Sequence, residues 1–288
     1  MPRPQPKYSF DCLLTSTYTV GWICALPVEF SAARRMLDNE HDFNPTFGSG
    51  DGNDYVFGSI GEHNVVINCP AAGTSGQSRA CQVAADMKST FPWIRFVLLV
   101  GIGGGVPWPR DVRLGDVVVG TSVIPYSIGK ATDHGFNITG QSISPPNVLL
   151  AAVTKLEDCL QTKNLSHSLE VAAVNYGNGR VTYSRPTEDR LYSNNFVHQP
   201  SCDCLKLSPR RISSMVRRQP RPGDQLGTHH GCIGTGSSVM KNAIQRDEVA
   251  AMANAICVEM EAAAVMDTTS CLPIRGISDY ADGHKNDE

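Results

Sequence analysis

Two carboxylates near the end of the chain, Glu261 and Asp279, are of the type and in the setting that acid–base chemistry requires. Glu261 precedes an alanine-rich run that predicts a helix, because alanine has the lowest cost of all residues in a helix. Asp279 follows the apolar residues 272–277, which predict a buried strand. A helix that leads back into a parallel strand places an acid at the strand's carboxyl end, where open α/β sheets bind ligands. Each carboxylate could also do no more than cap its helix or its turn.

A third carboxylate, Glu29, lies at another junction between a predicted strand and a predicted helix. Residues 18–26 form an apolar, β-rich run, and a helical pattern over 27–37 begins at a proline, which suits a first helical turn. A glutamate in that turn can simply complement the helix dipole. The spacing alone therefore leaves open whether Glu29 has a structural or a chemical role.

Two stretches of small residues follow predicted strands and could approach a ligand closely. The glycine-rich loop predicted at 101–107 comes after a continuous apolar strand at 96–100, which is typical of a parallel sheet. Glycine lets the backbone approach a flat ligand, but Val106 in the third glycine position excludes a dinucleotide fingerprint. Residues 72–79 open a predicted helix, whose free N–H groups could bind a nucleotide phosphate together with Arg79. A tight turn and a plain crossover loop are the structural alternatives.

Three sequence motifs narrow the range of folds and functions that these residues indicate. They are Arg-Leu-Gly-Asp-Val-Val-Val at 113–119, Val-Glu-Met-Glu-Ala at 258–262 and Arg-Gly-Ile-Ser-Asp at 275–279. Together they resemble the purine nucleoside phosphorylase and methylthioadenosine/adenosylhomocysteine nucleosidase superfamily, over roughly residues 18–288. The resemblance is closest to the fungal branch, whose members are often fused to sensor or repeat domains in immune-receptor-like proteins. The fold that it implies is a single α/β domain with a central mixed β-sheet flanked by helices.

The resemblance also implies chemical roles. Asp279 would protonate the departing purine at N7, and Ser278 would orient its carboxyl group. Glu261 would hold the ribose hydroxyls with Met260 under the sugar, and Glu29 would activate the attacking water. These roles suit an N-glycosidic bond, because it breaks through an oxocarbenium-like transition state. That state needs a protonated leaving group and a partner for the positive sugar.

Further residues match positions that border the ligand in the superfamily. Ile102, Gly103 and Gly104 belong to the glycine-rich stretch beside the purine and the ribose. Val239 or Met240 takes the place where the base is often stacked on an aromatic ring. Apolar contact with the base would then be kept while aromatic stacking is lost.

The nucleophile is expected to be water. Phosphorylases of the superfamily hold phosphate with an arginine late in the central strand and a serine or threonine in the glycine loop, where this chain has Leu99 and Ile102. Neither side chain can donate a hydrogen bond, so a phosphate dianion would be costly to desolvate. The predicted function is hydrolysis of a purine nucleoside or nucleotide, with adenine as the expected base. The alternatives are a phosphate-dependent phosphorylase and a nucleotide-sensing module of an immune-receptor-like protein; no cofactor or metal is expected.

Composition limits the partners and the compartment. The chain has 288 residues and a formal net charge of −3, which gives no electrostatic reason to expect nucleic acid or an acidic membrane as a partner. No apolar run is long enough to span a bilayer, and Asp11 interrupts any signal peptide. The 10 cysteines are scattered, which favours free thiols in a reducing compartment and a cytoplasmic location. The superfamily resemblance implies a homo-oligomer.

The domain organisation is predicted from shifts in composition. Residues 1–17 are rich in proline and predict a flexible arm before the domain at 18–288. Within that domain, 194–228 predict a surface insertion whose arginines are solvated or bind a charged substrate. A metal site there fits no common zinc spacing, and its ligands would be Cys202, Cys204, His229, His230 and Cys232. The superfamily continues past the residues that match 282–288 into a last helix, so we expect an uncovered sheet edge or a fragment.

Overall fold

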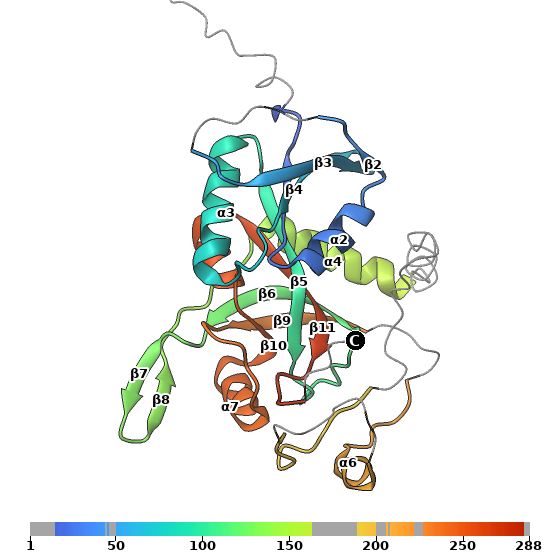
Figure 1. Ribbon diagram of the computed structural model, residues 1–288, viewed down its shortest axis with the longest axis vertical. Helices are drawn as coiled ribbons and strands as arrows, with labels where there is room; N and C mark the ends of the chain where they lie inside the picture. The colour runs from blue at the N-terminus through green and yellow to red at the C-terminus, as the bar shows by residue number, and fades with distance from the viewer. Residues whose placement is uncertain are drawn as a thin grey trace, which may run out of the picture. The chain divides into compact units, whose positions relative to one another are not determined.

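The computed structural model describes residues 15–43, 45, 50–162, 189–199, 206, 208–221 and 227–284. The chain has the predicted α/β fold, with a mixed β-sheet and helices (Figure 1). Its contacts form two compact units, the N-terminal unit (1–100 and 264–271) and the barrel unit (101–263 and 272–288). The chain passes between them within β5 (Phe96–Gly105), within α8 (Ala262–Thr268) and within β11 (Cys271–Asp279). Residues 171–176, whose sequence predicts a further strand, lie outside the described residues.

Strands of the N-terminal unit lie in the order β5-β1-β4-β3-β2. Their bounds are β1 (Val20–Ile23), β2 (Asn39–Glu40), β3 (Asp54–Ile60) and β4 (His63–Cys69). β1 is parallel to β4 and to β5, whereas β3 and β4 are antiparallel. The sequence predicts this pair of strands at 55–60 and 64–68, on either side of residues 61–63. This unit contains α2 (Pro27–Arg35), which begins at the predicted proline, α3 (Gln77–Thr90) and residues 264–268 of α8. One side of α3 is buried because its apolar residues recur at helical spacing.

The barrel unit contains a closed ring of strands. It consists of the second half of β5, then β11, β6 (Val117–Pro125), β9 (Thr228–Thr235) and β10 (Ala255–Glu259). The ring closes because β10 pairs with both β9 and β5, where Val258 lies opposite Gly104. β9 is parallel to β6 and β10, but β11 is antiparallel to β6. The prediction that the strand before Asp279 is parallel is therefore wrong for its pairing with β6. Asp279 does lie at the carboxyl end of that strand.

The glycine-rich residues after Val100 continue β5 instead of forming the predicted loop. The strand can continue because glycine has no side chain where neighbouring strands come close. A Cβ atom at Gly103 would lie 2.7 Å from Cys257 Sγ, and one at Gly105 would lie 2.8 Å from Ile277 Cγ2. These glycines therefore let β5 pack closely against β10 and β11.

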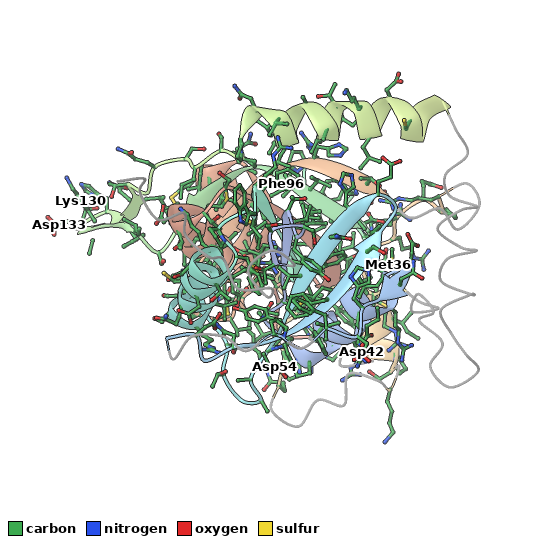
Figure 2. The ribbon with its side chains drawn as sticks, turned by 90° about the horizontal axis from the view of Figure 1, so that it is seen from above. Met36, Asp42, Asp54, Phe96, Lys130 and Asp133 are labelled. Carbon is green, nitrogen blue, oxygen red and sulfur yellow. The ribbon has the colours of Figure 1, made fainter. Side chains whose placement is uncertain are left out.

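Helices and a hairpin complete the described part of the barrel unit. They are α4 (Asn147–Thr162), α6 (Pro209–Ser214), α7 (Ala243–Ala253), β7 (Gly129–Thr132) and β8 (Gly135–Ile138). Asn242 starts α7 by accepting hydrogen bonds from the backbone N–H groups of Ile244 and Gln245, at 3.0 and 3.1 Å. The β7–β8 hairpin projects outward (Figure 1) and carries Lys130 and Asp133 near its tip (Figure 2). Among the described helices, none has the length and hydropathy needed to cross a membrane.

Two arginines of the predicted insertion at 194–228 are held in ion pairs. The Arg218 side chain is 8% exposed and pairs with Asp189, and Arg221 Nη1 lies 2.6 Å from Asp116 Oδ1. The expectation of solvated arginines is therefore wrong for these two, because acidic residues distant in the sequence pair with them. The boundaries of the insertion and of the domain stay predictions.

Candidate active site

Glu259 ends β10 and holds several neighbours in place. Its carboxylate accepts hydrogen bonds from the Thr235 hydroxyl and from Arg275. The side chains of Glu259 and Arg275 are each 1% exposed, so this ion pair is buried. Glu259 also accepts from the backbone N–H groups of Glu261, at 2.9 Å, and Ala262, at 2.9 and 3.1 Å, and so caps the start of α8. Sequence reasoning missed this role; the available signal was an acid just before a predicted helix start.

Glu261 is buried beside the Glu259–Arg275 ion pair. Its Oε2 lies 3.5 Å from Arg275 Nη2. Arg275 therefore lies close to both carboxylates, and its positive charge offsets their mutual repulsion. The backbone N–H of Ala262, at the start of α8, is capped by Glu259. Met260, between the two glutamates, is partly buried.

Asp279 is buried at the end of β11. Its Oδ1 accepts a hydrogen bond from the backbone N–H of Ala281 at 2.7 Å, and its Oδ2 accepts one from Ser278 Oγ at 3.1 Å. The first bond is the turn cap that the sequence left open. The second gives Ser278 the geometry that an orienting group needs. Both oxygens of the Asp279 carboxyl group are thus fixed by local partners.

Gly104 connects the surroundings of the two acids. A Cβ atom at Gly104 would lie 3.1 Å from Asp279 Oδ1 and 2.7 Å from Ala281 Cβ. Where β5 pairs with β10, Gly104 lies opposite Val258, the residue before Glu259. The end of β5 therefore lies between the carboxyl ends of β10 and β11, so the predicted residues from these three strands lie on adjacent strands of one ring.

The apolar residues predicted to touch the base differ in exposure. Met240 is buried, whereas Val239 is 52% exposed and Ile102 is 41% exposed. Met240 belongs to a cluster that also holds Tyr126, Val249, Val258 and Ala281. Sequence reasoning did not assign Tyr126 to the site, because nothing local links it to the motifs that it packs against. Burial, followed by the charge of Glu259, raises the pKa of the Tyr126 phenol, so this ring stays neutral.

The other predicted site residues, Glu29 and Arg79, belong to the N-terminal unit. Glu29 is buried in the first turn of α2, and its Oε2 accepts hydrogen bonds from the backbone N–H groups of Ala25 at 2.8 Å and Leu26 at 2.9 Å. Glu29 therefore caps the helix start, a structural role more specific than the helix-dipole interaction that the sequence left open, and its role toward water stays a prediction. Arg79 donates to Asn53 Oδ1 at 2.7 Å and lines a small pocket. The pocket is also lined by Cys24, Asn68, Thr74, Ser75 and Gly76.

The histidines of the conceivable metal site have acidic partners. His229 Nε2 lies 2.8 Å from Asp116 Oδ2, and His230 Nδ1 contacts Glu157. Within the part of the chain that the structure describes, no group of three or more His, Cys, Asp or Glu side chains could hold a metal ion. Outside the described residues lie Cys202 and Cys204.

The sequence profile of the Phosphorylase superfamily matches residues 19–288. The chain belongs to the Phosphorylase superfamily. Membership agrees with the resemblance that the three sequence motifs indicate.

Solved structures of nucleosidases share the superfamily fold seen here. One is the 5′-methylthioadenosine/S-adenosylhomocysteine nucleosidase of Neisseria meningitidis with methylthio-immucillin-A, at 19% identity and a TM-score of 0.57. Another is the Helicobacter pylori nucleosidase with butyl-thio-DADMe-Immucillin-A, at 14% identity and a TM-score of 0.57. Each comparison covers 93% of this chain and 88% of the other. At these identities the likeness concerns the fold alone.

A curated relative has a different description. It is a nucleotide-binding leucine-rich repeat (NLR)-like protein of Hyaloscypha variabilis, 38% identical over 283 residues. The match covers 95% of this chain and 28% of the relative. The chain thus spans little more than a quarter of the length of that relative.

Proposed function

We propose that the chain is an N-ribosyl hydrolase that cleaves the N-glycosidic bond of a purine nucleoside or nucleotide. The observation that carries this proposal is the pair of buried acids Glu261 and Asp279, which lie at or just after the ends of β11 and β10, the two strands that flank β5 in a Phosphorylase-superfamily fold. Adenine is the expected base, since the similar solved structures are nucleosidases named for adenosine derivatives. The products are the free base and ribose, or a ribose phosphate ester when the substrate is a nucleotide.

In the proposed reaction, the C1′–N9 bond breaks while Asp279 gives a proton to N7 of the purine. The base then leaves neutral, and the sugar carries the positive charge of the transition state. Ser278 holds one oxygen of the Asp279 carboxyl group, which favours one orientation of the acid. Glu261 accepts hydrogen bonds from the 2′- and 3′-hydroxyls, with Met260 under the sugar. Glu29 takes a proton from water, and the resulting hydroxide adds to C1′.

Water is preferred to phosphate as the nucleophile because of two apolar positions. Leu99, which matches the phosphate-binding arginine of phosphorylases, is fully buried in the N-terminal unit. Ile102, which matches their serine or threonine, has no hydrogen-bond donor on its side chain. A phosphate dianion would lose its hydration at such positions without replacement by hydrogen bonds. This supports the hydrolase over the phosphorylase.

The test measures base release from adenosine, inosine, AMP, ATP and methylthioadenosine in phosphate-free buffer, followed by addition of phosphate. We expect release of free base at a rate that phosphate does not change, with ribose or its phosphate ester as the second product. Release that requires phosphate and yields ribose 1-phosphate would establish the phosphorylase instead.

A nucleotide-sensing module is the second candidate, favoured by the NLR-like relative that is 38% identical to this chain. In that case the chain would bind a purine nucleotide and report its presence to a larger protein. Calorimetric binding of a nucleotide without base release over hours would support the sensor and oppose the hydrolase.

Self-association and a cytoplasmic location also remain expectations.

A further inference from the structure

Tyr280, the residue after Asp279, is held at both its backbone and its side chain by arginines. Its backbone oxygen accepts a hydrogen bond from Arg246 Nη1 at 2.7 Å. Its phenol accepts a hydrogen bond from Arg218 and donates one to Asp189. Tyr280 is 3% exposed and Arg246 is 1% exposed. The position next to Asp279 therefore has little freedom to move.

Arg218 closes this arrangement by also donating to Asp189, so that arginine, aspartate and phenol contact one another in a triangle. The guanidinium carbon lies 5.1 Å from the centre of the Tyr280 ring, over which it stacks. Burial, with the charge of Asp189, raises the pKa of the phenol. The phenol therefore keeps the proton that it donates to Asp189 near neutral pH.

The Arg218–Asp189–Tyr280 triangle also contacts the backbone of a neighbouring segment of the barrel unit, at Val112 and Leu114. Arg218 Nη1 donates to the backbone oxygen of Val112 at 3.0 Å, and the backbone N–H of Leu114 lies 3.3 Å from the Tyr280 hydroxyl. The segment that carries Arg218 is itself paired with the segment after Asp189, because Val216 N donates to Leu191 O at 2.8 Å. The backbone next to Arg218 is thus held in place by this hydrogen bond.

We propose that Arg218 and Asp189 are positioning residues that hold the proton donor Asp279 in place through Tyr280. This inference rests on the proposed function. The link is the turn after β11: Asp279 Oδ1 accepts from the backbone N–H of Ala281, on the far side of Tyr280. A shift of Tyr280 would move that N–H and turn the carboxyl group away from the purine. Arg218 comes from the predicted insertion, which thereby acquires a role in the chemistry.

A misplaced acid has a specific kinetic signature. A displacement of ~1 Å at a reacting group can cost on the order of 100-fold in rate, because proton transfer requires close alignment. The loss falls on kcat, whereas KM changes little, since Asp279 is not proposed to hold the ground-state substrate. The loss also depends on the leaving group. A p-nitrophenyl riboside releases a stable phenolate that needs no proton, so its hydrolysis does not depend on the alignment of Asp279.

The experiment compares Arg218→Met, Arg218→Lys and Tyr280→Phe in the full chain, with Arg217→Met as the matched control because Arg217 is exposed. We expect kcat for the preferred purine substrate to fall at least about tenfold in Arg218→Met and Tyr280→Phe. Arg218→Lys should recover part of the loss, and Arg217→Met should match the wild type. Hydrolysis of the p-nitrophenyl riboside should fall far less in every variant. Circular dichroism and thermal unfolding check that each variant is folded.

The outcomes separate this inference from the proposed function. Equal losses on both substrates, or a rise in KM alone, would show that the triangle only supports the fold and would overturn the positioning role. An unchanged kcat in Arg218→Met and Tyr280→Phe would overturn it as well. A wild-type chain that releases base from no purine substrate would overturn the hydrolase and this inference together.

Discussion

Glu259 and Arg275 form an ion pair in which each side chain is only 1% exposed. The pair joins β10 to β11, and Arg275 Nη2 also lies 3.5 Å from Glu261 Oε2. A buried charge that loses its partner keeps the full cost of its desolvation. The pair therefore links the stability of the barrel unit to the placement of a proposed substrate-binding acid.

Replacing Arg275 should destabilise the protein strongly. Arg275→Met leaves Glu259 as a buried carboxylate without its ion-pair partner, so we expect a loss of about 3–5 kcal/mol in the free energy of unfolding. Chemical unfolding followed by circular dichroism measures it. Arg34→Met is the control, since the Arg34–Glu40 pair has side chains 51% and 43% exposed and should cost only about 0–1 kcal/mol. Similar losses in both variants would contradict the assignment of Arg275 to a buried pair.

Asp279→Asn should abolish most turnover and leave the fold intact. The amide keeps the size of the side chain and can still accept the hydrogen bond from Ala281, but it has no acidic proton for N7. General acid groups contribute about 10²–10⁴-fold, so we expect kcat to fall at least ~100-fold. Steady-state base release measures it, with the exposed Asp267→Asn as control. A variant that kept more than about a tenth of the wild-type rate would remove Asp279 from the role of general acid.

Glu261→Gln should remove the preference for ribose over 2′-deoxyribose. The carboxylate is the proposed acceptor for the sugar hydroxyls, and hydrogen bonds to a charged group are roughly twice as strong as neutral ones. The ratio of kcat/KM for a riboside to that for its 2′-deoxyriboside should therefore approach one. The exposed Glu248→Gln should keep the wild-type ratio. If the wild type already treats the two sugars equally, Glu261 does not hold the hydroxyl groups.

Much of the fold could be predicted because the decisive signals were local. The apolar runs at 18–26 and 96–100, the proline that begins α2, and the turn between β3 and β4 each act over a few residues. The glycines of β5 led to a wrong prediction of a loop, because the contacts that require glycine there come from residues distant in the sequence. They stay in the strand because side chains of β10 and β11, distant in the sequence, occupy the space that a Cβ would need.

Candidate site residues could be predicted where they belong to a recognisable sequence motif. They could not be predicted where their place depends on a contact with a residue distant in the sequence. Glu261 and Asp279 stand in recognisable motifs, and both are buried as a chemical role requires. Glu259 stands in the same motif, but its partner Arg275 reaches it only after β10, α8 and β11 have formed. The same holds for Arg218, because an arginine-rich segment predicts solvent-exposed side chains. Only the fold brings Asp189 and Tyr280 into contact with Arg218.

Gly104→Ala should impair turnover because the added methyl group would meet the turn that carries Asp279. Its Cβ would lie 2.7 Å from Ala281 Cβ and 3.1 Å from Asp279 Oδ1, both too close without a shift. Overpacking of this kind typically costs about 1–3 kcal/mol, and the displaced acid should lower kcat at least about tenfold. Gly276→Ala on β11 is the matched control, because the nearest atom to its Cβ is Gly101 O at 4.0 Å. Equal kinetics in the two variants would contradict the contact between Gly104 and the turn.

The stability contribution of Asp116 should be lost only in strong acid. Burial alone would raise the pKa of this fully buried carboxyl, but hydrogen bonds from His229, Arg221 and the backbone N–H groups of Gly227 and Arg113 outweigh it and hold the pKa well below its ordinary value. A depressed folded-state pKa stabilises the protein above the unfolded-state pKa of about 3.9, and this stabilisation disappears as the pH falls through the folded-state value. The difference in unfolding free energy between wild type and Asp116→Asn should therefore be constant from about pH 6 to pH 5 and shrink below about pH 4. Urea unfolding at each pH measures it, and a difference that is unchanged at pH 3 or already shrinking at pH 6 would refute the assigned direction.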